Sequence, residues 1–453
     1  MKAKQNFTEG PILSTLTKFA MPVLLAILLQ DMYGAVDLQM VGRFGTAADI
    51  SAAATGSQIM FMVSAVIIGL AMGITVRIGQ QIGDGRPEDA GKTVGSGICL
   101  FVVAALVLTA GMLLGAPSIA RGVHAPPDAF DGTVRYLRIC GVGSLFIIGY
   151  NLVGSIFRGL GDSKMPLITV AIACAVNIAG DLLLVGGLGM GVTGAAVATV
   201  AAQAVSVALS LLIIRRRQLP FSLSKEDIHF NREINRSILK IGTPAALQDL
   251  LHNISFLVLV TIANSMGTIM SASVGVGGKV SVFLVVVPSA YMQAMSAFVA
   301  QNIGAGRETR ARRALLCGIL SSLAVGLIVA WMTFFHGDVL AGIFSKEAAV
   351  IAGAADYLKA YGVDCLLQCL VFCCVGYFNG CGHTFFVMVQ GLIGAFGVRL
   401  LMAMLLSRIA GGSLLILGLA IPGATAVQVF ICAGFLIWRT RKVKSGFVFQ
   451  KIS

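Results

Sequence analysis

The stretch QQIGDGRPEDA, residues 80–90, has a second copy in QNIGAGRETRARRA, residues 301–314. The two copies begin 221 residues apart, and each follows a long apolar run. A second pair, FRGLGDS at 157–163 and FNGCGHT at 378–384, has the same spacing. One match can arise by chance, but two pairs at one spacing predict that the chain contains a duplicated unit.

The apolar runs around these segments place the chain in a membrane. Apolar residues make up 57% of the sequence, charged residues make up 12%, and the mean hydropathy is +0.90, which excludes an ordinary soluble domain. Runs of about 20 mostly apolar residues are long enough to cross a bilayer as helices. We expect twelve such spans, near 18–42, 53–82, 94–116, 134–157, 166–188, 191–214, 238–262, 270–300, 314–336, 356–378, 384–407 and 413–438.

Six spans fall in each repeat, so both copies enter the membrane in the same orientation. The predicted fold class is therefore an all-α membrane protein with two six-helix lobes related by a pseudo-twofold axis along the membrane normal. We expect an N-terminal lobe at 1–214, a cytoplasmic linker at 215–237 and a C-terminal lobe at 238–453. Duplicated six-span lobes favour a transporter, although duplication without transport is the alternative.

The distribution of positive charge predicts orientation. The net charge is +13, but most Lys and Arg residues fall at alternate span ends, which is typical of the positive-inside bias rather than of nucleic-acid binding. We therefore expect a multi-pass protein of the plasma membrane, the cell inner membrane in bacteria, with both termini cytoplasmic. Membrane lipids are expected partners, nucleic acid is not, and a monomer is the default.

Two other classes of chemistry are not expected. Most of the 10 cysteines lie within the predicted spans without paired C-x-x-C spacing, so packing is favoured over a metal site. The chain contains no Walker lysine motif, which argues against an ATP-driven pump. We expect no enzyme, no cofactor and no metal other than a possible Na⁺.

An intramembrane carboxylate is the main functional signal. Asp37 lies 19 residues into the first span, roughly 28 Å along the helix. Asp181 in the fifth span falls in the same outer half of the membrane, with Asn177 one turn away, and Thr199 in the sixth span has a matching depth. Carboxylates buried in a bilayer normally face a cavity or a partner. The predicted cation site consists of Asp37, Asn177, Asp181 and Thr199.

Their chemistry leaves two coupling ions open. Two carboxylates, an amide oxygen and a hydroxyl suit Na⁺, and a pair of carboxylates shielded from water equally suits H⁺. A structural alternative is that Asn177 and Asp181 only tie helices together, or that an aspartate pairs with Arg399.

Other residues are candidates for a substrate cavity or for intramembrane charge. Adaptable Met and aromatic surfaces suit varied flat cations; the candidates are Gln30, Tyr33, Tyr291, Met292 and Met295, with ordinary helix packing as the alternative. Lys279 and Arg399 are costly within spans, where a helix-tying salt bridge and a role in transmitting lobe motion are both open.

These features together resemble the multidrug and toxic compound extrusion (MATE) family. The resemblance rests on YGAVDLQMVG at 33–42, the doubled Q-x-I-G-x-G-R, the F-R-G-x-G-D at 157–162, and the spacing of Asn177, Asp181 and Thr199, and it covers nearly the whole chain. It implies two six-helix lobes around a cleft, in which an inward gradient of H⁺ or Na⁺ drives export of mostly cationic, amphipathic compounds.

The resemblance also assigns expected roles. The quartet is most similar to the cation site of the branch that includes archaeal and DinF-type members. Pro22 matches a proline at which the first span bends when the site is protonated. The NorM-type branch has acids in the second lobe where this sequence has His252 and Gln368, with Asp249 and Asp364 one turn away from those positions, so we do not expect a second-lobe cation site.

The expected function is a secondary multidrug antiporter that works by alternating access. A lipid-linked oligosaccharide flippase of the same wider superfamily is the alternative within transport. Its cavity should be rich in cationic side chains, whereas only Lys279 and Arg399 lie away from the ends of the predicted spans. A membrane enzyme or receptor would need a catalytic constellation at one membrane face, and no nucleophile with a base in reach is present.

Overall fold

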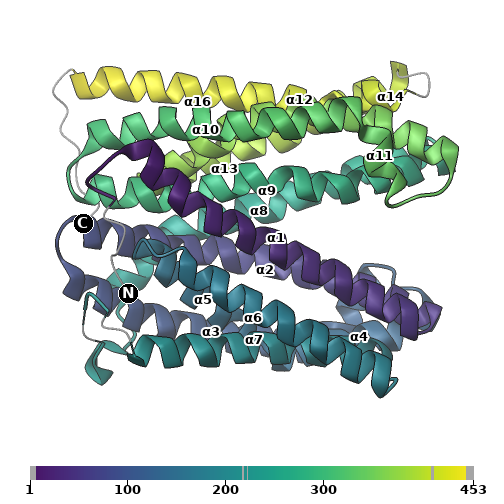
Figure 1. The fold of residues 1–453 in the computed structure, drawn as a ribbon, viewed down its shortest axis with the longest axis horizontal. Coiled ribbons are helices and arrows are strands. Elements are labelled where there is room, and N and C mark those ends of the chain that lie inside the picture. The colour runs from purple at the N-terminus through teal and green to yellow at the C-terminus, as the bar shows by residue number, and fades with distance from the viewer. Residues whose placement is uncertain (1–6, 217–218, 222, 410–412, 445–453) are drawn as a thin grey trace. The chain divides into compact units, whose positions relative to one another are not determined.

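Helices form nearly all of the regular structure. The computed structural model describes residues 7–216, 219–221, 223–409 and 413–444, and the elements in these ranges are helical (Figure 1). They are α1 Ile12–Phe44, α2 Ala47–Gly83, α3 Pro87–Gly122, α4 Pro127–Val142, α5 Ser144–Gly159, α6 Lys164–Asp181, the π-helix η1 Leu182–Gly187, α7 Gly191–Arg216, the 3-10 helix η2 Lys225–Asp227, α8 Arg232–Ser265, α9 Thr268–Gly304, α10 Glu308–Phe335, α11 Gly337–Gly342, α12 Ala348–Gly380, α13 Thr384–Leu392, the π-helix η3 Ile393–Leu400, α14 Leu401–Ile409, α15 Leu414–Gly418 and α16 Ala420–Lys444.

The predicted number of membrane spans is confirmed, with one span broken. Among the described residues, 11 helical segments are long and apolar enough to cross a bilayer, and a twelfth is made by α4 and α5 together. These two helices meet at Gly143 with a bend of 55°. A Cβ at Gly143 would lie 2.5 Å from a methyl group of Val200 in α7, so the bend needs a glycine there.

The chain forms two compact units that do not follow the order of the sequence. Unit 1 contains Met1–Leu250, Gln293–Cys317 and Gly376–Thr384, and unit 2 contains Leu251–Met292, Gly318–Val375 and Phe385–Ser453. Unit 1 therefore includes the repeated turn from both halves of the chain. The lobe boundaries expected from the sequence remain a prediction.

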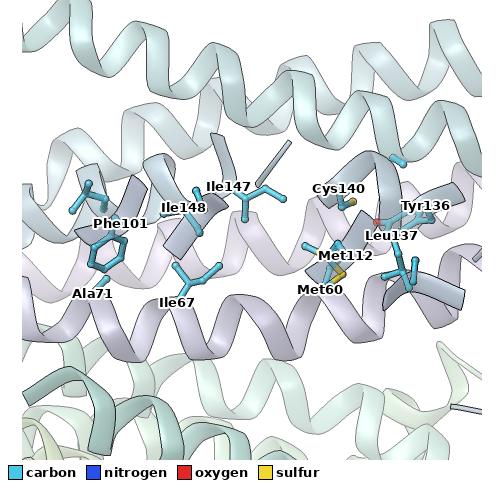
Figure 2. Close-up of a cluster of buried hydrophobic side chains, with 14 of the residues drawn as sticks. Met60, Ile67, Ala71, Phe101, Met112, Tyr136, Leu137, Cys140, Ile147 and Ile148 are labelled. Atoms are coloured by element: carbon cyan, nitrogen blue, oxygen red, sulfur yellow. The ribbon is translucent and has the colours of Figure 1, made fainter. Parts of the chain in front are cut away.

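The core of unit 1 is an apolar layer shared by α2, α3, α4 and α5 (Figure 2). Bulky side chains from α2 and α3 fill the space against the broken span, which buries the apolar faces of both of its halves. The labelled members are Met60, Ile67 and Ala71 of α2, Phe101 and Met112 of α3, Tyr136, Leu137 and Cys140 of α4, and Ile147 and Ile148 of α5, each at most 8% exposed. This packing fixes the position of α5, which lines the cavity described below.

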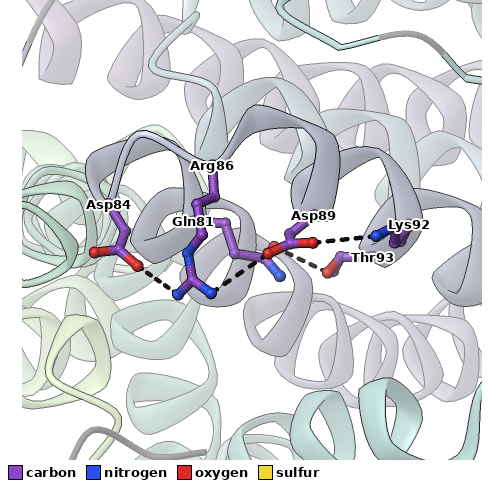
Figure 3. Close-up of polar contacts among 6 residues, drawn as sticks. All are labelled: Gln81, Asp84, Arg86, Asp89, Lys92 and Thr93. Carbon is purple, nitrogen blue, oxygen red and sulfur yellow. Dashed lines mark hydrogen bonds and ion pairs between the residues drawn. The ribbon is translucent and has the colours of Figure 1, made fainter.

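The first copy of the repeated turn joins α2 to α3 through polar contacts (Figure 3). Arg86 forms ion pairs with Asp84 and Asp89 on the surface, where such pairs contribute little to stability. The buried contact is a hydrogen bond of 2.9 Å from the Thr93 hydroxyl to the Gln81 side-chain oxygen. Because Gln81 is in α2 and Thr93 is in α3, this bond holds the two helices together below the turn.

The two copies of the repeated turn contact each other within unit 1 through what we call the glutamine clasp. The clasp consists of the side-chain amides of Gln80 and Gln301 and the carbonyl groups of Gly380 and Gly159. Gln80 Nε2 donates to the Gly380 oxygen at 3.2 Å, and Gln301 Nε2 donates to the Gly159 oxygen at 2.9 Å. Gln80 and Gln301 are 221 residues apart in the sequence, and so are Gly159 and Gly380. The duplicated sequence therefore forms two equivalent hydrogen bonds.

Two glycines allow the helix ends in the clasp to approach closely. A Cβ built at Gly83 would lie closer than 3.0 Å to the Gln301 carbonyl oxygen, and one at Gly304 would meet the Gln80 carbonyl in the same way. Real Cβ atoms do not approach so closely, so neither position has room for a side chain unless α2 and α9 separate. The repeated glycine in Q-x-I-G is therefore a requirement of this contact.

The N-terminal segment before α1 also docks on the second copy of the turn. The Phe7 ring is fully buried, with its centroid 4.9 Å from that of Phe19 and 5.2 Å from that of Phe298. Arg310 donates to the carbonyl oxygens of Phe7, Glu9 and Gly10, at 3.0, 2.6 and 2.8 Å. The Arg310 guanidinium thus donates hydrogen bonds to three backbone carbonyl oxygens in the segment that precedes α1.

We expect Arg310→Ala to release this segment. Hydrogen bonds from a charged donor contribute about 1.5–3 kcal/mol each, and the substitution removes three of them while leaving the apolar contact of Phe7. Hydrogen exchange should show faster exchange at residues 7–12, with the rest of α1 unchanged. Arg313→Ala is the matched control, because Arg313 is exposed on the same helix. Equal exchange in both variants would show that the hydrogen bonds do not hold the segment.

Candidate cation site

Three helices of unit 1 position the residues predicted to bind a cation. Asp37 lies on α1, Asn177 and Asp181 lie one turn apart on α6, and Thr199 lies on α7. At the crossing of α6 and α7, a Cβ at Gly180 would lie only 2.9 Å from that of Ala198. Each of these small residues directly precedes a site residue, so the crossing brings Asp181 and Thr199 to the same depth.

The two carboxyl groups lie next to each other. Asp37 is 6% exposed and Asp181 is 0% exposed, and their side chains interact both electrostatically and at hydrogen-bonding range. Ionised carboxylates only accept hydrogen bonds, and in the described part of the chain no donor reaches either oxygen of Asp181. Two buried acceptors in contact need a proton or a cation between them.

Further unsatisfied polar atoms surround this pair. Asn177 is fully buried, and neither its amide nitrogen nor its amide oxygen has a partner among the described residues. The Thr199 hydroxyl donates to the Ala195 oxygen of its own helix at 3.0 Å, which leaves its oxygen free to accept or to coordinate. Carboxylate, amide and hydroxyl oxygens are ligands that Na⁺ accepts, so the same donor set fits either coupling ion.

A π-helix begins directly after Asp181, which the sequence analysis did not expect. Residues Leu182–Gly187 form η1, and the Leu184 backbone passes close to Gly194 of α7. Single π-helical turns within α-helices are frequent at functional sites because they change the direction of the side chains next to them. The sequence LLLVGG has no property that distinguishes it from an ordinary helix end.

Pro22, the predicted hinge, lies within α1, which continues through it from Ile12 to Phe44. Proline has no N–H to donate to the preceding turn, so α1 is weakened there without being broken.

The substrate-cavity candidates do not form one group. Gln30 lines a cavity in unit 1, and the Tyr33 side chain interacts with Gln203 of α7. Tyr291 and Met295 are 2% and 0% exposed, so neither lines an open surface in this structure. Met292 is half-buried.

In unit 2, Asp364 and Arg399 lie near each other. Asp364 of α12 is fully buried, receives a hydrogen bond from Gln368 and lies in the electrostatic field of Arg399. Arg399, in η3, is 5% exposed. Within unit 2, Asp364 is thus an acid near Arg399.

The remaining intramembrane candidates are more open. Lys279 of α9 and His252 of α8 are exposed in unit 2, and Asp249 of α8 is half-buried in unit 1.

Arg158 is a charged residue that was not among the predicted site residues. It lies in the last turn of α5, one residue beyond the expected end of the fourth span at residue 157. Its side chain lines the cavity that contains Gln30. The bend between α4 and α5 was not expected from the sequence.

The 10 cysteines all lie in described residues, and none is part of a disulfide bond. Among the described residues, no group of three or more His, Cys, Asp or Glu side chains is arranged to hold a metal ion.

A helical bundle with this many long apolar helices defines a multi-pass membrane protein. The MatE family model matches residues 22–183 and 244–405, and the two matches start at Pro22 and Pro244. The chain belongs to this family, the multidrug and toxic compound extrusion transporters.

Similar proteins extend over most of the chain. A Bacillus subtilis (strain 168) protein described as the probable multidrug resistance protein YpnP is 27% identical over 460 residues, covering 100% of both chains. A Shewanella oneidensis protein described as a FAD transporter is 26% identical and covers 80% of this chain and 82% of its own length. A solved structure of a multidrug resistance MATE family transporter in an outward-facing conformation matches with a TM-score of 0.90 at 20% identity, over 97% of this chain and 98% of that chain. The structural likeness shows the two-lobe transporter fold.

Proposed function

We propose that this protein is a multidrug efflux antiporter that exports amphipathic, mostly cationic compounds in exchange for H⁺ or Na⁺ by alternating access. Membership of the family supports multidrug export, as does the likeness to multidrug resistance proteins over the full length. The observation that carries the coupling proposal is the burial of Asp37 and Asp181 within interaction range of each other, because two buried carboxylates are stabilised when they share a proton or a cation.

The proposed cycle uses the position of Asp37 on α1. Binding of H⁺ or Na⁺ from outside neutralises the Asp37 and Asp181 pair and draws α1 toward α6. Because Pro22 weakens α1 fifteen residues before Asp37, α1 bends there and reduces the space available to the exported compound. Release of the ion to the cytoplasm reverses the change.

The energetics depend on the charge that is exchanged. The membrane potential contributes about 2.3 kcal/mol per net charge per 100 mV, so exchange of one monovalent cation for one H⁺ gains nothing from it. We place the protein in the plasma membrane, with both termini in the cytoplasm and with the monomer as the transporting species.

The test of this function is dye efflux from proteoliposomes that contain the full chain. We expect ethidium efflux to be driven by an imposed pH gradient or by an imposed Na⁺ gradient, and to be abolished by the matching ionophore, nigericin for H⁺ or monensin for Na⁺. The gradient that drives efflux identifies the coupling ion. Efflux that is the same with and without both gradients would contradict antiport.

A further inference from the structure

A small cavity in unit 1 is lined by a half-buried guanidinium and by no carboxylate. Its walls come from α1, α2, α5, α6 and α9, and about 60 Å³ of it is open to water-sized molecules. The polar residues of its lining are Gln30, Tyr150, Asn151, Arg158, Thr169 and Gln293, and the other side chains are apolar. The cavity thus has one positive charge and neutral polar groups.

The charge on Arg158 is not paired with a carboxylate among the described residues. Arg158 Nη2 donates to the Ser155 hydroxyl oxygen, one turn earlier on α5, at 2.8 Å. Arg158 is half-buried, and removing part of a charge from water is costly unless an opposite charge or several hydrogen bonds compensate it. A single bond to a neutral hydroxyl compensates only part of this cost.

The glutamine clasp fixes the backbone next to Arg158. The Gly159 carbonyl group, in the residue that follows Arg158, accepts the hydrogen bond from Gln301. A Cβ at Gly159 would come within 2.9 Å of the Thr75 carbonyl oxygen, so the end of α5 is also packed tightly against α2. The end of α5 that carries Arg158 is therefore a rigid support for a binding residue.

The neutral polar groups around Arg158 offer donors from three helices. The Asn151 amide and the Thr169 hydroxyl already donate to carbonyl oxygens of their own helices. Gln30 of α1, Tyr150 of α5 and Gln293 of α9 also line the cavity, and each carries an N–H or O–H donor. A guanidinium surrounded by neutral donors, with no acid present, fits an anion and disfavours a cation.

We propose that this cavity binds the oxyanion of an amphipathic molecule, a carboxylate or phosphate group, and that Arg158 recognises it. The remainder of the molecule lies along the apolar face of α1 made by Val23, Ala26 and Ile27, which follows Pro22 directly. If the ligand is an exported compound, the cavity adds anionic and zwitterionic substrates to the cationic ones, and the inference then rests on the proposed function. Binding of the ligand to the cavity does not itself require transport.

The test is a binding measurement with two probes that differ only in charge. Dansylglycine has a carboxylate, and dansylglycinamide replaces it with a neutral amide. Their fluorescence is titrated against the purified full-length protein in detergent, without any ion gradient. We expect wild type to bind dansylglycine about tenfold more tightly than the amide, as is typical of a buried charge-assisted hydrogen bond.

Two variants at one position separate charge from shape. Arg158→Gln should lose the preference for dansylglycine and leave the affinity for dansylglycinamide unchanged. Arg158→Lys keeps the charge but loses the planar fork, so it should retain a reduced preference. Arg313→Gln is the matched control, because Arg313 is exposed on α10 outside the cavity, and it should retain the full preference. Equal affinities of the two probes for wild type would overturn the proposal even if Arg158→Gln does not fold.

A lipid headgroup and a water-soluble compound could both supply the oxyanion, and nanodiscs distinguish them. The titration is repeated in phosphatidylcholine nanodiscs with and without phosphatidylglycerol. If an anionic lipid is the ligand, phosphatidylglycerol will weaken dansylglycine binding to wild type but not to Arg158→Gln. If the ligand comes from solution, phosphatidylglycerol will have no effect. Because these titrations require no efflux, failure of the anion site and failure of antiport are separate results.

Discussion

Asp181→Asn will abolish gradient-driven dye efflux while leaving the protein folded. The substitution replaces a carboxylate by an amide of the same shape, so the packing of α6 against α7 is retained. It removes one of the two negative charges that a shared proton or Na⁺ neutralises. The affinity of the site for the ion beside Asp37 is therefore lost. We expect efflux under the driving gradient to fall by about tenfold or more, as measured by ethidium fluorescence in proteoliposomes.

Asp37→Asn should have the same effect, and the double variant should be no worse than either single one, because the two carboxyl groups act as a unit. Asp31→Asn is the matched control, since Asp31 is a half-buried acid on the same helix that the proposed mechanism does not use. Undiminished efflux in Asp181→Asn would make the carboxylate pair structural, and Asp249, His252 and Asp364 would become the next candidates.

Gly83→Ala and Gly304→Ala will open the glutamine clasp. Each adds a Cβ where the carbonyl group of the opposite helix lies, so α2 and α9 must separate. Overpacking of this kind costs about 1–3 kcal/mol, which corresponds to a fivefold or larger change in the closed population. The reporter is Cys381, which is 6% exposed and follows Gly380 of the clasp.

The measurement uses a chain in which Cys381 is the only cysteine, labelled with a membrane-impermeant maleimide in inside-out vesicles. Both glycine variants should accelerate labelling by about fivefold or more and lower the rate of efflux. Gly111→Ala is the control, because a Cβ at Gly111 on α3 meets nothing within 4 Å. If labelling of Gly83→Ala stays at the rate of wild type, the clasp is not what excludes solvent from that end of unit 1.

The sequence predicted the helical architecture because the bilayer constrains it strongly. Backbone groups in a bilayer must bond internally, so long apolar runs have to be helices. It also pointed to Asp37 and Asp181 as neighbours, since the rise per residue gives the depth of a side chain without any knowledge of packing. The approach of the two carboxyl groups depends on the packing of α1 against α6, which the sequence does not give.

The features that the sequence did not reveal depend on contacts between distant residues. The partners in the glutamine clasp are 300 and 142 residues apart, so the repeat marked the glutamines but not their acceptors. Arg158 was not a predicted site residue because the cavity that it lines is made by residues from five helices, which the sequence alone does not bring together. The π-helix after Asp181 likewise has no local sequence signal.

The docking of the N-terminal segment sets an order for biogenesis. Phe7 accepts hydrogen bonds from Asn302 and Arg310, residues about 300 positions later in the chain. At about 5–20 residues per second, the ribosome reaches them roughly 15–60 s after Phe7 is made. Unit 1 as a whole also needs Gly376–Thr384. During this interval the early helices stand in the bilayer with the surfaces that receive the late segments uncovered, so an insertase or chaperone that shields those surfaces should raise the yield of folded protein.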